Sequence, residues 1–126
     1  MKKPNQARFE LPELMSIFGV NLLAGLIGIS STSLRRYQSG ARVMPDKVKA
    51  RLQFLSLIVE HLAGAYNDVG IRRWFERKRV LLQGRSPVEI LSNEWKPQSS
   101  SPTKIRQLAY SLASSTTDGI TTKSTW

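Results

Sequence analysis

Apolar residues in the first third of the chain recur at helical spacing, but the pattern breaks twice. The breaks fall near Gly19 and Gly28, so short helices joined by turns fit the pattern better than one long rod. The first helix is expected over residues 11–18, with a proline at an early position where its missing N–H costs little. The second carries a leucine-rich stretch that Asn21 can cap or open, and Gly28 can end it because glycine readily takes a positive φ.

A third helix is expected over residues 31–39. Ser30 or Ser31 can cap it, because a serine side chain accepts hydrogen bonds from the N–H groups of the first helical turn, and Gly40 can end it. The second and third helices together predict a helix-turn-helix, in which a small residue, a turn glycine and inward-facing large residues let two helices cross closely. These structural positions are Ala24, Gly28, Ile29, Leu34 and Tyr37.

The outward face of the third helix is polar and holds two adjacent arginines. In a helix-turn-helix this is the recognition helix, which lies in the major groove of DNA and presents its N-terminal residues to base edges. An arginine fork matches guanine O6 and N7 or a phosphate, and Gln and Ser side chains also hydrogen-bond bases. An isolated arginine pair on a helix is more often a solvated face. Here the small residue, the turn glycine, the serine cap and the buried aliphatic residue all lie at the positions that a helix-turn-helix requires, and this favours DNA contact. The predicted DNA contacts are Ser31, Thr32, Ser33, Arg35, Arg36, Gln38 and Arg42.

Asp46 can cap a long helix that runs to about Tyr66. Its apolar residues form a stripe at spacings of three and four, which Leu57 and Ile58 widen. A helix with so wide an apolar surface contacts more than one partner, so we expect it to link the two halves of the chain or to pair subunits. The stripe consists of Val48, Leu52, Leu55, Val59, Leu62 and Tyr66. The charged residues expected off the stripe are Lys47, Lys49, Arg51 and Glu60.

The stretch over residues 71–95 predicts a compact helical pair with an aromatic anchor. A helix carries two adjacent aromatic residues, a short apolar piece follows, and a glycine turn leads to a second helix start. That start is a capping box, in which a serine and a glutamate three residues later each bond the other's backbone N–H, with proline at the first helical position. The residues concerned are Trp74, Phe75, Leu82, Gly84, Ser86, Pro87 and Glu89.

The chain ends in a further helix and a polar tail. Ser101 or Thr103 can cap the helix, whose apolar residues are Ile105, Leu108, Ala109 and Leu112. The tail over residues 114–126 is mostly Ser and Thr, a composition that favours disorder. Its large apolar residues are Ile120 and Trp126. A terminal tryptophan can anchor in a partner's pocket, and the alternative is an untidy terminus.

The composition restricts the kinds of binding partner and the cellular location that we expect. A chain of 126 residues suits one domain or two small helical units that share a core. Nineteen Lys plus Arg against nine Asp plus Glu give a net charge of +10, which favours nucleic acid or an anionic membrane as partner. Because the chain has no cysteine, disulfides and thiolate metal sites are excluded, and a reducing cytoplasm is the expected location. The one histidine, His61, is expected to be an ordinary surface or core residue.

An uncharged, mostly apolar run over residues 14–30 follows Lys2 and Lys3 and imitates a signal peptide. Acidic residues stand directly before this run, Asn21 interrupts it, and at about 17 residues it lies at the short limit of a membrane span. We therefore expect neither export nor membrane insertion.

Six basic residues lie between Arg72 and Arg85, where Glu76 is the acidic residue. Two interpretations stay open. These side chains form a second surface for the DNA backbone, or they form a solvated face that keeps a small protein soluble.

Two stretches resemble known families. Residues 9–50 resemble Xre-type repressors, which have a GIS-like turn, an aromatic residue near the end of the recognition helix, then glycine and a later proline, here Tyr37, Gly40 and Pro45. The second half resembles the toxin-binding domain of Xre/MbcA/ParS-type antitoxins, in which a tryptophan precedes a leucine-glycine element and a Thr/Ser-Pro helix start. The matching residues are Trp74, Leu82, Gly84, Ser86, Pro87, Glu89 and Leu91. The chain departs from that pattern at Arg77-Lys78-Arg79, where the family has Pro-Asn, and in the Pro/Ser-rich run after Trp95.

The resemblance implies an antitoxin that neutralises a RES-type toxin, an enzyme that consumes NAD or transfers from it, and that represses its own operon. Its partners would be double-stranded operator DNA, the cognate toxin and a second copy of the chain. The implied toxin contacts lie in the C-terminal part, where we assign Trp126 and, more weakly, Ile120. The alternative is a stand-alone dimeric transcriptional regulator or phage-like repressor whose second half only dimerises.

The sequence contains no motif of an enzyme. Paired carboxylates, a histidine suitably spaced from a nucleophile and an acid, and a phosphate-cradling loop are all absent from it, so we expect no catalysis, cofactor or metal. We expect an all-α protein. Its parts are a helix-turn-helix domain over 1–45, a connecting or dimerisation helix over 46–67, a toxin-binding domain over 68–113 and a flexible tail over 114–126.

Overall fold

The computed structural model describes residues 10–92 and 95–122, with side chains as far as residue 112. Helices account for 71% of the structure, and no strand occurs in the ranges described, which confirms the all-α class. The elements are α1 (Leu11–Phe18), α2 (Val20–Ile27), α3 (Ser31–Ser39), α4 (Asp46–Leu62), α5 (Asp68–Glu76), the 3₁₀ helix η1 (Val80–Leu82), α6 (Pro87–Leu91) and α7 (Ser100–Thr122).

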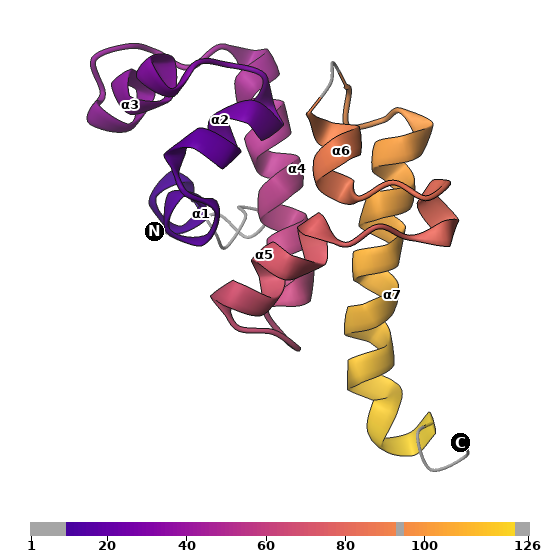
Figure 1. Ribbon diagram of the computed structural model, residues 1–126. Helices are drawn as coiled ribbons and strands as arrows, with labels where there is room; N and C mark the ends of the chain where they lie inside the picture. Colours follow the sequence, from indigo (N-terminus) through magenta and orange to yellow (C-terminus); the bar gives the residue numbers. More distant parts are fainter. Residues whose placement is uncertain (1–9, 93–94, 123–126) are drawn as a thin grey trace.

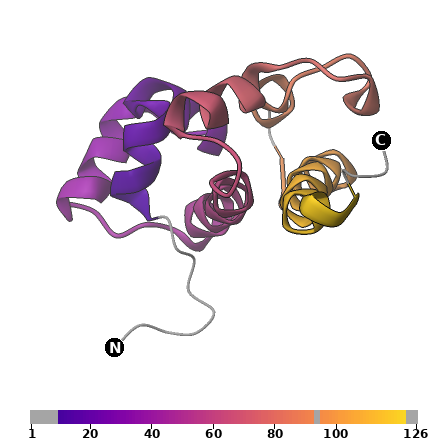
Figure 2. The same cartoon turned by 90° about the horizontal axis from the view of Figure 1, so that it is seen from below.

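The helices are arranged around α4, which lies near the centre of the molecule (Figure 1). The α1–α3 group lies on one side of α4 and α7 runs alongside α4 on the other, while α5 and α6 bridge the two sides (Figures 1 and 2). One buried hydrophobic cluster takes residues from all seven α-helices. The two halves of the chain therefore share a core, and the wide apolar surface of α4 packs against both α2 and α7.

The first three helices follow the glycine and serine signals of the sequence. The backbone of Gly19 separates α1 from α2 with a φ of 84°, and Gly28 ends α2 in the left-handed conformation with a φ of 76°. Ser30 caps α3, since its hydroxyl accepts a hydrogen bond of 3.0 Å from the N–H of Ser33. The apolar run over 14–30 is thus two short helices, and none of the helices within the described ranges has both the length and the apolarity needed to cross a membrane.

The prediction for Arg51 is wrong, because this side chain lies in the core and is only 5% exposed. Its Nη1 donates to the carbonyl oxygen of Ile27 at 3.0 Å, and its Nε and Nη2 donate to that of Trp95 at 3.1 and 2.8 Å. A guanidinium can be buried when carbonyl oxygens accept its fork of N–H groups. The helix is also shorter than predicted. It ends at Leu62, and Tyr66 lies beyond it in an exposed position.

Trp95 completes the arrangement around Arg51. Its indole Nε1 donates to the carbonyl oxygen of Leu26 at 2.8 Å, its ring lies 5.1 Å from that of Phe54, and the Arg51 guanidinium lies 5.4 Å from the Trp95 ring centroid. The last carbonyls of an α-helix have no partner within the helix. Arg51 and Trp95 supply donors to two such carbonyls of α2. We call Arg51, Trp95 and the carbonyl groups of Leu26 and Ile27 the Arg51–Trp95 clamp.

The α5–α6 segment packs on the first helices through aromatic residues. Phe75 of α5 is fully buried, and its ring meets Phe18 of α1 edge-on at 4.9 Å between centroids. Trp74, Leu82 and Pro87 are also buried, as the sequence indicates. The turn after η1 uses left-handed backbone at Gln83 and at Gly84, with φ angles of 60° and 79°.

The capping box at the start of α6 is confirmed. The Ser86 hydroxyl accepts the N–H of Glu89 at 3.1 Å, and the Glu89 carboxylate accepts the N–H of Ser86 at 2.8 Å. That backbone hydrogen bond lowers the pKa of Glu89, and Lys78 nearby lowers it further. The charged carboxylate is therefore the form that holds this helix start.

The last helix, α7, begins at Ser100 and buries Ile105 and Ala109 against the core. Its backbone continues to Thr122, through residues whose composition favours disorder. The predicted toxin contacts fall outside the described side chains: that of Ile120 is not among them, and Trp126 lies beyond the described residues.

We expect Arg51→Ala to lower the free energy of unfolding by about 2–5 kcal/mol, because buried carbonyls would lose a charged donor and a cavity would remain. Lys49→Ala is the matched control, since Lys49 is exposed on the same helix, and it should change stability by no more than about 0.5 kcal/mol. Urea unfolding followed by far-UV circular dichroism measures both. Equal unfolding midpoints for the two variants would show that the clamp does not hold the fold.

Candidate nucleic-acid interface

The turn between α2 and α3 is closed tightly by backbone hydrogen bonds. The N–H of Ile29 donates to the carbonyl oxygen of Ala24 at 3.0 Å, across the left-handed Gly28. Ala24 and Leu34 are buried, so the small residue and the aliphatic occupy the interior positions that a helix-turn-helix requires. A Cβ at Gly28 would lie 2.8 Å from Nη1 of Arg51, so the clamp also requires glycine at this turn.

A side-chain hydrogen bond ties the starts of α2 and α3 together. The Ser31 hydroxyl donates to Oδ1 of Asn21 at 2.7 Å. Asn21 therefore does not cap α2, which begins after Gly19, but fixes the position of the α3 N-terminus. In the sequence, this contact is marked only by a single amide side chain in a leucine-rich helix. Its hydrogen bond to Ser31 can be recognised only from the three-dimensional structure.

The outward face of α3 is exposed and cationic. Thr32, Arg35, Arg36 and Gln38 are exposed, and α3 carries no acidic residue. No ion pair to either arginine occurs among the residues with described side chains. Both guanidinium groups can therefore meet phosphates or base edges without first losing a carboxylate partner.

The other residues predicted to contact DNA, Ser31, Ser33 and Arg42, differ from the exposed α3 residues in exposure or position. Ser31 and Ser33 are only half-exposed, and each takes part in a hydrogen bond inside the turn, Ser31 with Asn21 and Ser33 with the Ser30 hydroxyl at 3.1 Å. They position the helix start in this structure. Arg42 is exposed in the loop after α3, and Tyr37 packs partly buried against the core.

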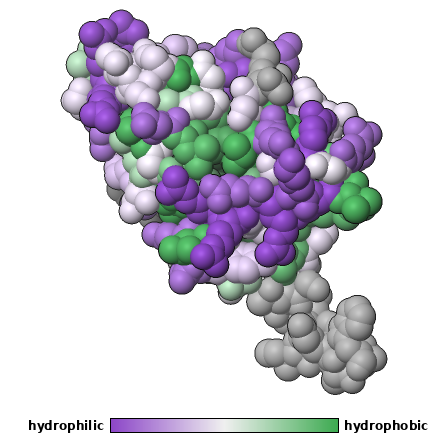
Figure 3. Space-filling view, in the orientation of Figure 1, coloured by the Kyte–Doolittle hydropathy of each residue, from purple (hydrophilic) through white to green (hydrophobic). Residues whose placement is uncertain are grey.

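A second hydrophilic area crosses the face of the molecule that Figure 3 shows. It covers α5 and the segment after it, and an apolar recess separates it from the hydrophilic surface over α3. Some of its basic residues lie close to a carboxylate. Arg72 lies 4.0 Å from Glu76, and Lys78 lies 3.5 Å from Glu89. The other exposed cations here are Arg73, Arg77 and Arg85.

Arg79 belongs to the framework of this area. Its guanidinium lies 4.4 Å from the Trp74 ring centroid and donates to the carbonyl oxygens of Trp74 and Arg77, each at 2.9 Å. Burial lowers the pKa of Arg79, and the neighbouring charge of Arg77 adds to the effect. The arginine therefore braces the turn between α5 and α6, and a solvated-face interpretation does not apply to it.

The only histidine, His61, is half-buried and meets the ring of Tyr110 edge-on at 5.4 Å. Within the part of the chain that the structure describes, no group of three His, Asp or Glu side chains could hold a metal ion.

Comparison with known proteins yields no match to this chain, whether against protein-family models, curated proteins or solved structures. The function of this chain must therefore be inferred from the exposed face of α3 and from the sequence resemblance.

If α3 enters the major groove, Arg35→Ala or Arg36→Ala should weaken specific DNA binding by about 1–3 kcal/mol for a base contact. For a phosphate contact, the salt dependence of binding should instead decrease by about one unit of slope. Arg106→Ala is the control, because Arg106 is exposed on α7, away from α3. Fluorescence anisotropy with a duplex from upstream of the protein's own gene measures affinity at several salt concentrations. Unchanged affinity and slope in both arginine variants would refute the assignment of α3.

Proposed function

We propose that this protein binds a double-stranded operator through α3 and represses its own operon. The observation that carries the proposal is the exposed, acid-free face of α3, with Arg35 and Arg36 on a helix whose start and turn are fixed by hydrogen bonds. A rigid support matters because base recognition requires donors held in place. The net charge of +10 adds attraction to the DNA backbone.

We further propose that the chain is the antitoxin of a toxin–antitoxin pair and neutralises a RES-type, NAD-consuming toxin by direct binding in the bacterial cytoplasm. The resemblance of the α5–α6 segment to toxin-binding domains supports this role. The exposed apolar residues Val80 and Leu81 give that segment a surface suited to a protein partner. Without a toxin gene beside it, the chain is better explained as a stand-alone dimeric regulator.

Operator binding of this kind implies a homodimer, because two recognition helices must lie about 34 Å apart on one face of DNA. We expect twice the monomer mass at micromolar concentration, or on binding DNA, by analytical ultracentrifugation. A chain that stays monomeric in both conditions would count against a two-fold operator complex.

The toxin part of the proposal is tested by co-expressing the chain with the product of the neighbouring gene in a growth assay. We expect the full chain to restore growth and a chain truncated after Ser115 to lose at least part of that protection, because truncation removes Ile120 and Trp126. Full protection by the truncated chain would exclude the tail as the inhibitory element. If the full chain never protects, the stand-alone regulator replaces the antitoxin.

A further inference from the structure

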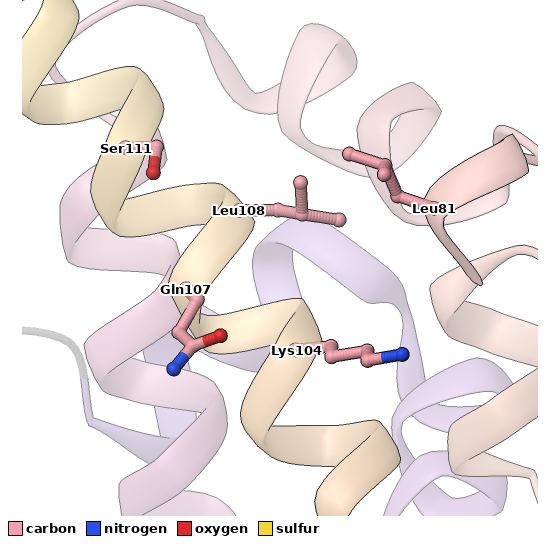
Figure 4. Close-up of a pocket in the computed structure, with 5 residues that line it drawn as sticks. All are labelled: Leu81, Lys104, Gln107, Leu108 and Ser111. Atoms are coloured by element: carbon pink, nitrogen blue, oxygen red, sulfur yellow. The ribbon is translucent and has the colours of Figure 1, made fainter.

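A groove lies between η1 and α7. These two elements lie at the end of the molecule opposite to α3 (Figures 1 and 2). One pocket of the groove has a volume of about 320 Å³, and Figure 4 shows Leu81 of η1 and Leu108 of α7 pointing toward each other across it. Lys104, on the same helix as Leu108, extends toward the η1 side. The centre of the groove is thus apolar, with a cation at its edge.

The groove continues along α7 beyond this pocket. A smaller hollow of about 80 Å³ shares Leu81 and Lys104 with it, and a third of about 240 Å³ shares Arg85 and Ile90 with the second. Together the three hollows follow α7 from Ser100 to Ser111, which is roughly 17 Å of helix. That length suits a short segment of another protein better than a small molecule.

Leu81, which lines the groove, and its neighbour Val80 are both exposed on one turn. Val80 is 91% exposed and Leu81 66%, although both are large aliphatic residues. The turn that presents them is closed by hydrogen bonds from the N–H of Arg79 to the carbonyl of Arg85 at 3.1 Å and from the N–H of Gly84 to that of Arg79 at 2.8 Å. Adjacent apolar side chains on a braced turn indicate a protein contact, because folding alone gives no reason to expose them.

The charges of the groove favour an acidic partner. Its charged lining residues are Lys104 and Arg85, and none of the described lining residues is acidic. Arg77 is exposed on the same turn. Glu89, which lies nearby, is engaged by Lys78 and by the Ser86 backbone. A segment with carboxylates on both sides of an apolar residue would meet cations along the groove and an apolar pocket at its centre.

We propose that the groove between η1 and α7 binds an acidic, amphipathic segment of a partner protein, with one large apolar side chain between Leu81 and Leu108 and carboxylates at Lys104 and Arg85. This inference rests on the proposed role of the chain as a protein-binding regulator, and it assigns that role a surface. Another copy of this chain fits less well, because its net charge is +10, and residues 1–9 carry three cations and no acid. Since α3 lies at the opposite end, one molecule can hold DNA and the partner segment together.

The test uses the full ¹⁵N-labelled chain and a synthetic peptide of about 12 residues, with a central leucine flanked by glutamates, which matches the length of the groove. We expect chemical-shift changes in η1 and in residues 104–111, and none in α3. A matched peptide with lysine in place of every glutamate should cause no such changes. The probe contains neither toxin nor DNA, so its result is separate from the neutralisation and operator assays.

Variants sharpen the test. The double variant Lys104→Glu with Arg85→Glu should reverse the preference and bind the lysine peptide, which a loss of folding would not produce. Leu81→Ser should weaken binding of the glutamate peptide by about tenfold or more, as expected for loss of one buried leucine contact. Val69→Ser is its control, because Val69 is also exposed, at 59%, but lies at the start of α5 outside the groove.

Several outcomes would overturn the proposal. These are the absence of shift changes at millimolar peptide, equal binding of both peptides, and glutamate-peptide binding that survives charge reversal. Concentration-dependent shifts in the groove without peptide would assign it to a second copy of the chain. Shifts produced only by vesicles of anionic phosphatidylserine would assign it to a membrane surface.

Discussion

The burial of one guanidinium at the centre of the molecule is the constraint on which the rest of this fold depends. A charged group in the core is tolerated only when acceptors surround it, and Arg51 finds them in the carbonyls of Ile27 and Trp95. Those acceptors belong to distant parts of the chain, so satisfying the arginine brings α2, α4 and the segment before α7 to one place. The same contact closes the end of α2, whose last carbonyls would otherwise be buried without donors.

This arrangement supports α2, α3 and the turn between them from outside the helix pair. The turn at Gly28 lies directly against the Arg51 side chain. Two residues before Gly28, the carbonyl of Leu26 accepts a hydrogen bond from the indole of Trp95. Asn21, near the start of α2, also holds the start of α3 through Ser31. The arginines of α3 therefore project from a helix whose N-terminal start is held by these contacts. Trp95 also lines one end of the groove beside α7, so a single side chain belongs both to the support of α2 and to the wall of the groove.

Local signals allowed much of the fold to be predicted. The bounds of α1 and α3, the Ser30 cap and the Ser86–Glu89 capping box follow from residues within a few positions of each other, where helix-terminus chemistry decides. The helical period predicts an exposed Arg51, because periodicity ranks arginine as polar and takes no account of distant carbonyls that can accept hydrogen bonds from its N–H groups. The sequence does not predict the groove at Leu81 for a similar reason. Its two walls are far apart in the sequence, and an aliphatic residue is expected to be buried.

The distance along the chain between the parts of the clamp also sets an order of events. Leu26 and Trp95 are 69 positions apart, and Arg51 and Trp95 are 44 apart. Synthesis proceeds from the N-terminus, so α2 and α3 are made well before the tryptophan that completes the contacts at the end of α2. Until that residue arrives, the Leu26 carbonyl lacks its indole donor and the Arg51 guanidinium lacks the Trp95 carbonyl as an acceptor. A prematurely ended chain would thus carry an incomplete α2–α3 unit, and quality-control proteases would meet it in a less compact form.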